Sequence, residues 1–293
     1  RNPDVKLAQA LRYKKPSPKV ERQSVTVLFG MYNELMAQRR PGTTEPLCSF
    51  NPFQAWRKRV GTPQRRAAGI QKAMSDLAWS TLIDVANDIP EDPQQRLWAL
   101  RRRLIFNMLR GSWDRRSAIA AATWADVSID GYGITHLKVP RKGQVDPQPK
   151  PLPPSLAAEL LAFRKEAGLP EILDEKSRGH SIFWFGGRSA GKGGPVHDHL
   201  IYREIKVLFE AAAQRLERAE GDASLSPQEL ADRAAARQQL LRAGAGPHAI
   251  RHTMATQFMD SGGDPRVAQE ILGHSSVAIT TTTYDSKPVK RQA

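Results

Sequence analysis

The stretch PHAIRH, residues 247–252, places two histidines and an arginine within five positions, as His248, Arg251 and His252. A guanidinium keeps its positive charge at every physiological pH, whereas an imidazole gains and loses a proton close to neutrality. Residues of these types at this spacing could therefore bind an anionic group and move a proton in the same place.

Two more side chains that could take part in such chemistry follow downstream. His274 comes at the end of DPRVAQEILGH, in which Asp264 and Pro265 predict the start of a helix and Gly273 predicts its end. His274 should therefore lie on a tight turn just past that helix. Tyr284 lies in TTTTYDS. Its phenol has an ordinary pKa of about 10, so it needs a base or a strong positive field before it can attack as a nucleophile.

The element that must position the first group is a helix that starts at Pro247, which places His248 in the first turn. At roughly 100° per residue, the three basic side chains fall within an arc of about 100°. The apolar residues Ile250, Met254 and Phe258 occupy a separate arc of about 80°. The apolar side should pack, while the basic side near a helix N-terminus suits an anion. Taken alone, the pattern describes a solvated basic face equally well.

The composition favours a polyanionic partner. The chain has 293 residues, 40% of them apolar, and a formal net charge of +14. That length allows one large or two moderate domains, and the excess charge favours nucleic acid first and an acidic membrane surface second. The sequence contains no apolar run that could span a membrane and no visible signal peptide. The single cysteine, Cys48, excludes an intrachain disulfide and a multi-cysteine zinc site, which fits a reducing cytosol.

The order H-x-x-R-H, then L-G-H at 272–274, then a tyrosine, resembles the tyrosine recombinase (phage integrase) family. The interval from Arg251 to His274 is also similar to that of the family. The resemblance implies an earlier arginine and a hairpin lysine. DRRSAIAAATWAD resembles the first box of the family through RRS and the following W-x-D, which makes Arg115 the first arginine and Arg116 the competing choice. The tip PRKGQ supplies Lys142 as the lysine.

The resemblance implies that Tyr284 attacks a phosphodiester, cuts one DNA strand, and leaves a 3′-phosphotyrosyl link and a free 5′-hydroxyl. The transition state gains negative charge on its non-bridging oxygens, which two guanidiniums match. His248 is the expected general base, Lys142 the expected acid for the leaving 5′-oxygen, and His274 a hydrogen-bond partner of the phosphate. His252 should have a structural or supporting role. Rejoining needs no ATP, and no metal or other cofactor is expected. The expected catalytic set is Tyr284, Arg115, Lys142, His248, Arg251 and His274.

The sequence departs from the family pattern in three ways. Ala118 stands where the family usually has an acidic residue, Trp113 stands where it usually has glycine, and the step from His274 to Tyr284 is one residue longer. Two alternatives stay open: a catalytically weakened relative that binds DNA sites without cutting them, and a strand relaxer of the type IB topoisomerase kind.

The expected partner is double-stranded DNA with specific recombination sites, bound by a homotetramer, with a possible helper or partner recombinase and no membrane. The expected location is the cytoplasm, in association with the nucleoid. Basic segments should contact the DNA backbone and give a strong salt dependence, although each could instead be a solvated charged face. The residues predicted to make these contacts are Arg57, Lys58, Arg59, Arg65, Arg66 and Arg102.

The pattern of elements predicts a mainly α fold with a small antiparallel β-sheet (α+β), a tyrosine recombinase catalytic domain preceded by a partial helical DNA-binding domain. Residues 1–62 are assigned to the partial domain with a basic N-terminal arm, and 63–72 to a linker. Residues 73–293 are assigned to the catalytic domain, with an extra helical insertion around 215–244.

Local signals place the elements of the larger domain. Ser75 predicts one helix start, Asp92 with Pro93 a second, and the capping box SPQE a third. A further helix is expected over RRSAIAAATWADV, between the helix that starts after Asp92 and a hairpin around the Lys-Gly tip. A strand is expected over SIFWF. GGRSAGK, residues 186–192, fits part of a phosphate-binding loop, but glycine follows where magnesium needs Ser or Thr, so a surface loop is favoured.

Overall fold

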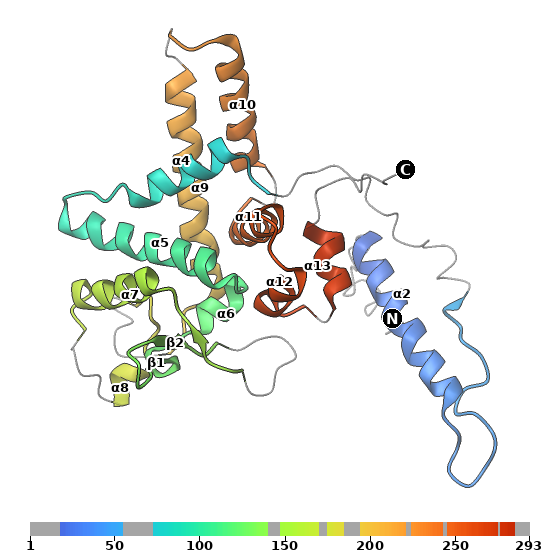
Figure 1. The fold of residues 1–293 in the computed structure, drawn as a ribbon. Coiled ribbons are helices and arrows are strands. Elements are labelled where there is room, and N and C mark those ends of the chain that lie inside the picture. The colour runs from blue at the N-terminus through green and yellow to red at the C-terminus, as the bar shows by residue number, and fades with distance from the viewer. Residues whose placement is uncertain are drawn as a thin grey trace, which may run out of the picture. The chain divides into compact units, whose positions relative to one another are not determined.

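The computed structural model shows a chain that divides into two compact units, residues 1–70 and 71–293 (Figure 1). The structure describes residues 18–54, 73–139, 147–169, 175–184, 194–220, 224–242, 245–274 and 276–284.

The first unit is built on one long helix, α2 (Pro18–Ala37), as its apolar spacing predicts. The segment after it folds back through a bridge between Arg39 and Pro46. The side chain of Asn51 then donates to the carbonyl of Phe29 and to Asn33, both at 2.9 Å. These bonds tie the returning segment to α2.

The second unit is mostly helical. Its N-terminal half contains α4 (Asp76–Asn87), α5 (Pro93–Ser112), α6 (Arg116–Ala121), the 3₁₀ turn η1 (Trp124–Asp126), α7 (Pro154–Glu166) and α8 (Glu175–Arg178). Its C-terminal half contains α9 (Asp198–Glu220), α10 (Pro227–Leu241), α11 (Pro247–Asp260), α12 (Pro265–Leu272) and α13 (Val277–Tyr284). Among the described residues, no helix is long and apolar enough to cross a membrane.

A small antiparallel sheet joins α6 to α7. It consists of β1 (Val127–Ile129), β2 (Thr135–Leu137) and β3 (Lys150–Pro151), in that order. Val127 pairs with Leu137, and Leu137 in turn pairs with Lys150. The fold is therefore mainly α with a small antiparallel sheet, as the sequence predicts.

The main core forms around α5, which packs against α4, α7, α9 and α11. Its consecutive residues Leu104, Ile105 and Phe106 are almost completely buried. The predicted caps hold: the side chain of Ser75 accepts from the amide of Ala78, and that of Asp92 accepts from the amide of Gln95. The sequence thus fixes where α4 and α5 begin.

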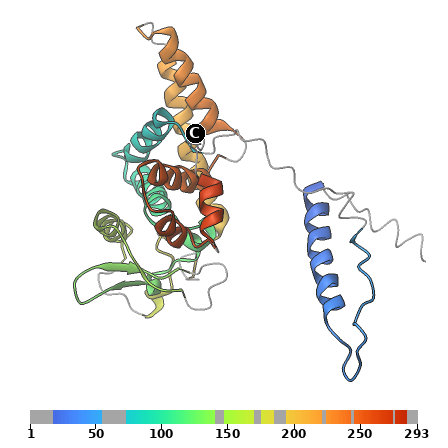
Figure 2. The same cartoon turned by 45° about the vertical axis from the view of Figure 1, so that its right-hand side comes forward.

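Helices α9 and α10 lie side by side and project from the rest of the second unit (Figures 1 and 2). The predicted capping box starts α10, with reciprocal bonds between Ser226 and Glu229. The C-terminal part of α9 and all of α10 cover the region in which the sequence predicts extra helix.

Helices α11, α12 and α13 lie next to one another (Figure 1), and they contribute to a second, smaller apolar cluster. It consists of Trp113, Ala255, Ala268, Leu272 and Tyr284. The side chains of Trp113 and Phe258 meet edge to face, with ring centroids 5.4 Å apart. This cluster connects the end of α5 to the last helices of the chain.

Two predicted elements differ from the structure. The described part of SIFWF, residues 181–184, forms no strand: Ser181 makes only an isolated bridge with Thr123, while Ile182 and Phe183 are fully buried. Their apolar character therefore reflects burial in a turn. The helix expected after Asp114 also stops early, because α6 ends at Ala121 and η1 follows a break in the helix.

Candidate active site

Three of the predicted catalytic residues line one cleft of about 330 Å³. Arg115 comes from the corner between α5 and α6, whereas His248 and Arg251 come from the first turns of α11. Arg116 and Tyr202 also line this cleft. Several cationic side chains around one small, partly open space suit a phosphate group.

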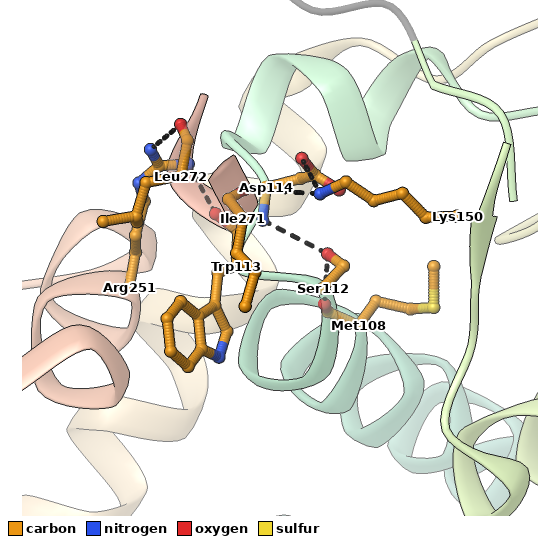
Figure 3. Close-up of polar contacts among 8 residues, drawn as sticks. All are labelled: Met108, Ser112, Trp113, Asp114, Lys150, Arg251, Ile271 and Leu272. Carbon is orange, nitrogen blue, oxygen red and sulfur yellow. Dashed lines mark hydrogen bonds and ion pairs between the residues drawn. The ribbon is translucent and has the colours of Figure 1, made fainter. Parts of the chain in front are cut away.

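Arg251 is the most deeply placed of these cations, with only 3% of its surface exposed. One terminal nitrogen donates to the carbonyl of Trp113, and the other donates to the carbonyl of Leu272 at 2.6 Å (Figure 3). Burial lowers the pKa of the guanidinium, and the positive charge of Arg115 lowers it further, while Tyr284 and Asp114 raise it. Arginine nonetheless stays protonated, so a fixed positive charge lies at the base of the cleft.

Tyr284 is the last residue of α13 and is also 3% exposed. Burial has the largest effect on its phenol and raises the pKa overall. The positive charges of Arg251 and Arg115 offset part of that effect. The step from His274 to Tyr284 is spanned by a short loop and α13, which bring the phenol to the arginines.

His274 packs against the nucleophile predicted from the sequence. Its ring stacks on Tyr284, with planes 6° apart and centroids 5.9 Å apart, and its Nδ1 lies 2.9 Å from the hydroxyl of Thr280. Gly273 ends α12 in the left-handed conformation, at φ 60°, and so turns the chain toward this position. Burial lowers the pKa of His274, as do the charges of Arg251 and Arg115, so its imidazole is neutral at pH 7.

His248 and His252 form a pair one helical turn apart. Their Nε2 atoms are 3.1 Å apart, so one of the two must donate a proton to the other. His248 is exposed to the cleft, whereas His252 is buried, with its ring centroid 4.9 Å from that of Tyr284. The pair therefore connects the cleft to the side of the phenol.

The structure favours Arg115 over Arg116 as the first arginine. Arg116 pairs with Asp198 of α9 at 3.1 Å and lies over the ring of Tyr202. Arg115 instead acts electrostatically on Arg251, His274 and Tyr284. It therefore lies near the three groups that the sequence assigns to the same phosphate.

Trp113 holds an unusual backbone conformation at the centre of this arrangement. Its φ is 55°, and among the described residues it is the one non-glycine with a positive φ. The tyrosine recombinase family, which the sequence resembles, usually has glycine at this position. Glycine adopts such a conformation at no steric cost. Trp113 turns the chain after α5, so that its carbonyl meets Arg251 and the next two residues approach the cleft.

Several predicted site residues cannot be placed. Lys142 lies outside the described residues, and so do five of the predicted DNA contacts: Arg57, Lys58, Arg59, Arg65 and Arg66.

The sixth predicted DNA contact, Arg102, makes an ion pair within the second unit. Its Nε donates to the buried carboxylate of Glu204 at 3.2 Å, and Arg101 donates to the same carboxylate at 2.7 Å. Arg101, Arg102 and Arg103 are consecutive on α5, and all three pair with carboxylates inside the second unit, since Arg103 pairs with Glu159. The run of charge in the sequence did not show which partners lie across α7 and α9.

Residues that sequence reasoning missed also surround the site. Asp114 is buried beside Arg115, and Lys150 of β3 lies 3.5 Å from its carboxylate (Figure 3). Thr280 binds His274, and Tyr202 lines the cleft. The position of Asp114 next to the first arginine was a usable signal, but nothing in the proline-rich segment around Lys150 indicates its role.

Part of the chain that carries these residues matches a known protein family. Residues 194–290, which contain His248, Arg251, His274 and Tyr284, match the model of the phage integrase family. Over these residues the chain is similar to the phage integrase family, which is a family of tyrosine recombinases. Arg115 lies before the matched residues, so its assignment rests on the geometry above.

The family relatives are tyrosine recombinases. The XerC recombinase of Xanthomonas campestris is 25% identical over 237 residues, covering 80% of this chain and 60% of the relative. That of Mesorhizobium japonicum is 27% identical over 217 residues, covering 74% of this chain and 55% of the relative. The chain thus spans little more than half the length of these relatives. The XerC of Mycobacterium leprae is 52% identical over 46 residues, 16% of this chain and 15% of the relative.

Solved structures share the fold. A XerH site-specific recombinase in a post-cleavage complex with palindromic difH substrate superposes with a TM-score of 0.57 at 14% identity, covering 98% of this chain and 67% of its own. The Tn1549 transposon integrase, in complex with circular intermediate DNA, gives 0.54 at 16% identity, with 95% and 78% covered. The arrangement of helices and small sheet in this chain is therefore that of the tyrosine recombinase fold.

Proposed function

We propose that this protein is a site-specific DNA recombinase of the integrase type, which cuts and rejoins DNA strands through a 3′-phosphotyrosyl intermediate. The observation that carries the proposal is the convergence of Arg115, His248, Arg251, His274 and Tyr284. They come from the corner between α5 and α6, from α11, from the turn after α12 and from α13, and they meet within one small region. The match of residues 194–290 to the phage integrase model and the DNA-bound structural relatives support DNA as the substrate.

In the proposed reaction, the Oη of Tyr284 attacks the phosphorus of a phosphodiester. The phenolic proton passes to His248, directly or through His252, and the bond from phosphorus to the 5′-oxygen breaks. The leaving 5′-oxygen takes a proton from Lys142 and becomes a hydroxyl. Attack by a 5′-hydroxyl on the phosphotyrosine reverses these steps, so the phosphoester bond is conserved and no ATP is consumed.

Each side chain around the phosphate has a specific role in the proposal. Arg115 and Arg251 bind the non-bridging oxygens, whose negative charge increases in the transition state. His274 is neutral at pH 7, so it can donate a hydrogen bond to a phosphate oxygen without adding charge. The raised pKa of Tyr284 implies that the phenol stays protonated until the substrate and the base are in place.

We further propose a partial DNA-binding domain over residues 1–62 and a catalytic domain over 73–293. Four copies would act on two DNA sites, and a helper protein is compatible with this arrangement. The structural relatives of XerH and integrase type, bound to recombination-site or transposon-derived DNA, support the DNA site as partner. Mass determination of the protein with and without its DNA site measures the number of copies.

Duplex DNA selected from a randomised pool by binding to the protein provides a test. A nick placed next to the scissile position lets the short fragment that carries the free 5′-hydroxyl diffuse away. The covalent intermediate is then trapped, because no 5′-hydroxyl remains to attack it. We expect a covalent adduct and, with two intact copies of the selected site, exchanged strands. Selective binding without any adduct would contradict the proposal and identify a non-cutting relative. Relaxation of a plasmid that lacks the site, without exchange, would identify a topoisomerase-like activity instead.

A further inference from the structure

Two cations bridge the same pair of backbone segments (Figure 3). Arg251 donates to the carbonyls of Trp113 and Leu272. Lys150 donates to the carboxylate of Asp114 at 3.5 Å and to the carbonyl of Ile271 at 3.3 Å. These four contacts, which connect residues 113–114 to residues 271–272, are called the cation clamp below.

The clamp supplies hydrogen-bond donors to the carbonyls at the C-terminal end of α12. The last carbonyls of a helix have no partner within it, and they carry the negative end of the helix dipole. In α12 these include the carbonyls of Ile271 and Leu272, each of which accepts from one of the two cations. On the other side, the carboxylate of Asp114 is 5% exposed and has Lys150 as an ion-pair partner.

The two clamped segments carry site residues directly next to them. Arg115 follows Asp114, and His274 follows Leu272 after the single residue Gly273. The backbone of each site residue is thus at most two residues from a clamp contact. Arg251 belongs to the site itself, whereas Lys150 lies on β3, an element that carries none of the other site residues.

We propose that Lys150 and Asp114 are positioning residues of the active site, because their ion pair holds the corner bearing Arg115 against the turn bearing His274. The reaction concerned is the proposed strand cleavage. Lys150 also starts the strand that pairs with β2, and Lys142 lies in the segment between these two strands. The clamp therefore fixes the base of the predicted lysine hairpin to the phosphate cleft.

The surroundings of Lys150 allow clean substitutions. Asp114, Lys150 and His274 line a cleft of about 850 Å³ on this side of the site, and the side chain of Lys150 is 27% exposed. A methionine of similar length therefore fits at position 150 without steric conflict. Lys165, an exposed lysine on α7, provides a control in which the same charge is removed elsewhere.

The first experiment measures the rate of covalent adduct formation on the nicked, selected duplex. We expect Lys150→Met and Asp114→Asn each to lower this rate by about 10- to 100-fold, the range that a misplacement of about 1 Å produces. Lys150→Arg should recover most of the rate, and Lys165→Met should leave it unchanged. The double variant should be about as slow as the slower single variant, because the pair acts as a unit. An additive double variant, or full activity in Lys150→Met, would overturn the proposal.

A DNA substrate with sulfur in place of the bridging 5′-oxygen distinguishes loss of positioning from loss of the general acid. A thiolate leaves without protonation, so this substrate restores a variant that lacks the general acid. We expect it to leave the defect of Lys150→Met in place, relative to wild type, and to restore Lys142→Ala. Restoration of Lys150→Met would make Lys150 the acid itself and would refute its role in positioning.

A second measurement needs no DNA. Nuclear magnetic resonance gives the titration midpoint of His274, whose pKa is lowered by burial, Arg251 and Arg115. Opening the clamp should move His274 away from these arginines, so Asp114→Asn should raise the midpoint. Simple loss of a negative charge would lower it, and that result, or no change, would overturn the proposal. If wild type forms no adduct, the proposed function fails, while this titration still decides the clamp.

Discussion

The positive charge of the Arg251 guanidinium acts on the phenol of Tyr284, and each of these two residues is only 3% exposed. Arg251 is anchored by backbone carbonyls on both sides, so it presents a fixed positive charge to the phenol. The proposed nucleophile thus lies against one of the groups that would bind its target phosphate. Even so, burial keeps the pKa of Tyr284 raised in the absence of DNA.

The raised pKa of Tyr284 predicts a late ionisation. In the DNA-free protein, difference absorbance between wild type and Tyr284→Phe should show tyrosinate forming only above about pH 10, the ordinary phenol value. The folded state then holds a proton that the unfolded chain has lost. The unfolding free energy of wild type should therefore fall relative to Tyr284→Phe as pH rises above about 10. A midpoint at or below the ordinary value would contradict this prediction.

The lowered pKa of His274 predicts a loss of stability at low pH, whereas the raised pKa of Tyr284 predicts one at high pH. Its titration midpoint should lie below the ordinary value of about 6.5, and Arg115→Gln should raise it by removing a nearby positive charge. Because the folded state resists protonation, stability relative to His274→Gln should fall as pH drops below about 6.5. An unchanged midpoint in Arg115→Gln would show that Arg115 lies too far from the site to bind the same phosphate.

The left-handed backbone of Trp113 predicts an unusual order of stabilities. Trp113→Ala should destabilise the protein by roughly 3–5 kcal/mol, because a large buried ring that packs on Phe258 is lost. Trp113→Gly loses the same ring but relieves a strain of about 1–2 kcal/mol that alanine keeps. Urea denaturation should therefore find the glycine variant more stable than the alanine variant. The reverse order would show that the positive φ costs nothing.

The internal pairing of Arg102 predicts a change in stability without a change in DNA binding. Glu204→Gln should cost about 3–5 kcal/mol, since Arg101 would be left buried beside a neutral partner. Arg102→Gln should leave the slope of log affinity against log salt concentration unchanged. Loss of a phosphate contact would instead reduce that slope by about one. Such a reduction would restore the original assignment of Arg102 to DNA contact.

The elements around the site could be predicted largely from the sequence, because local chemistry determines them. The caps at Ser75, Asp92 and Asp264, and the left-handed Gly273, set the starts and ends of their helices as expected. The residues around PHAIRH could be predicted as a candidate site because their types and order are specific, and the structure brings His252, His274 and Tyr284 together. Local signals of this kind carry over directly into structure.

Long-range partners could not be predicted in the same way. Lys150 and Asp114 are separated along the chain by α6, β1 and β2, and no periodicity links them. Arg102 looked like part of an exposed basic run until α9 brought Glu204 against it. The strand expected over SIFWF failed for a related reason, because an apolar run of that length is equally compatible with a buried turn.

The identity of the nucleophile tests the account most directly, because a second tyrosine offers a matched control. Tyr202 lines the same cleft as Arg115, His248 and Arg251, whereas Tyr284 reaches the arginines from α13. The measurement compares adduct formation by Tyr284→Phe and Tyr202→Phe on the nicked, selected duplex. We predict no adduct with Tyr284→Phe and an adduct with Tyr202→Phe. An adduct that survives Tyr284→Phe, or that is lost only with Tyr202→Phe, would contradict the proposed mechanism.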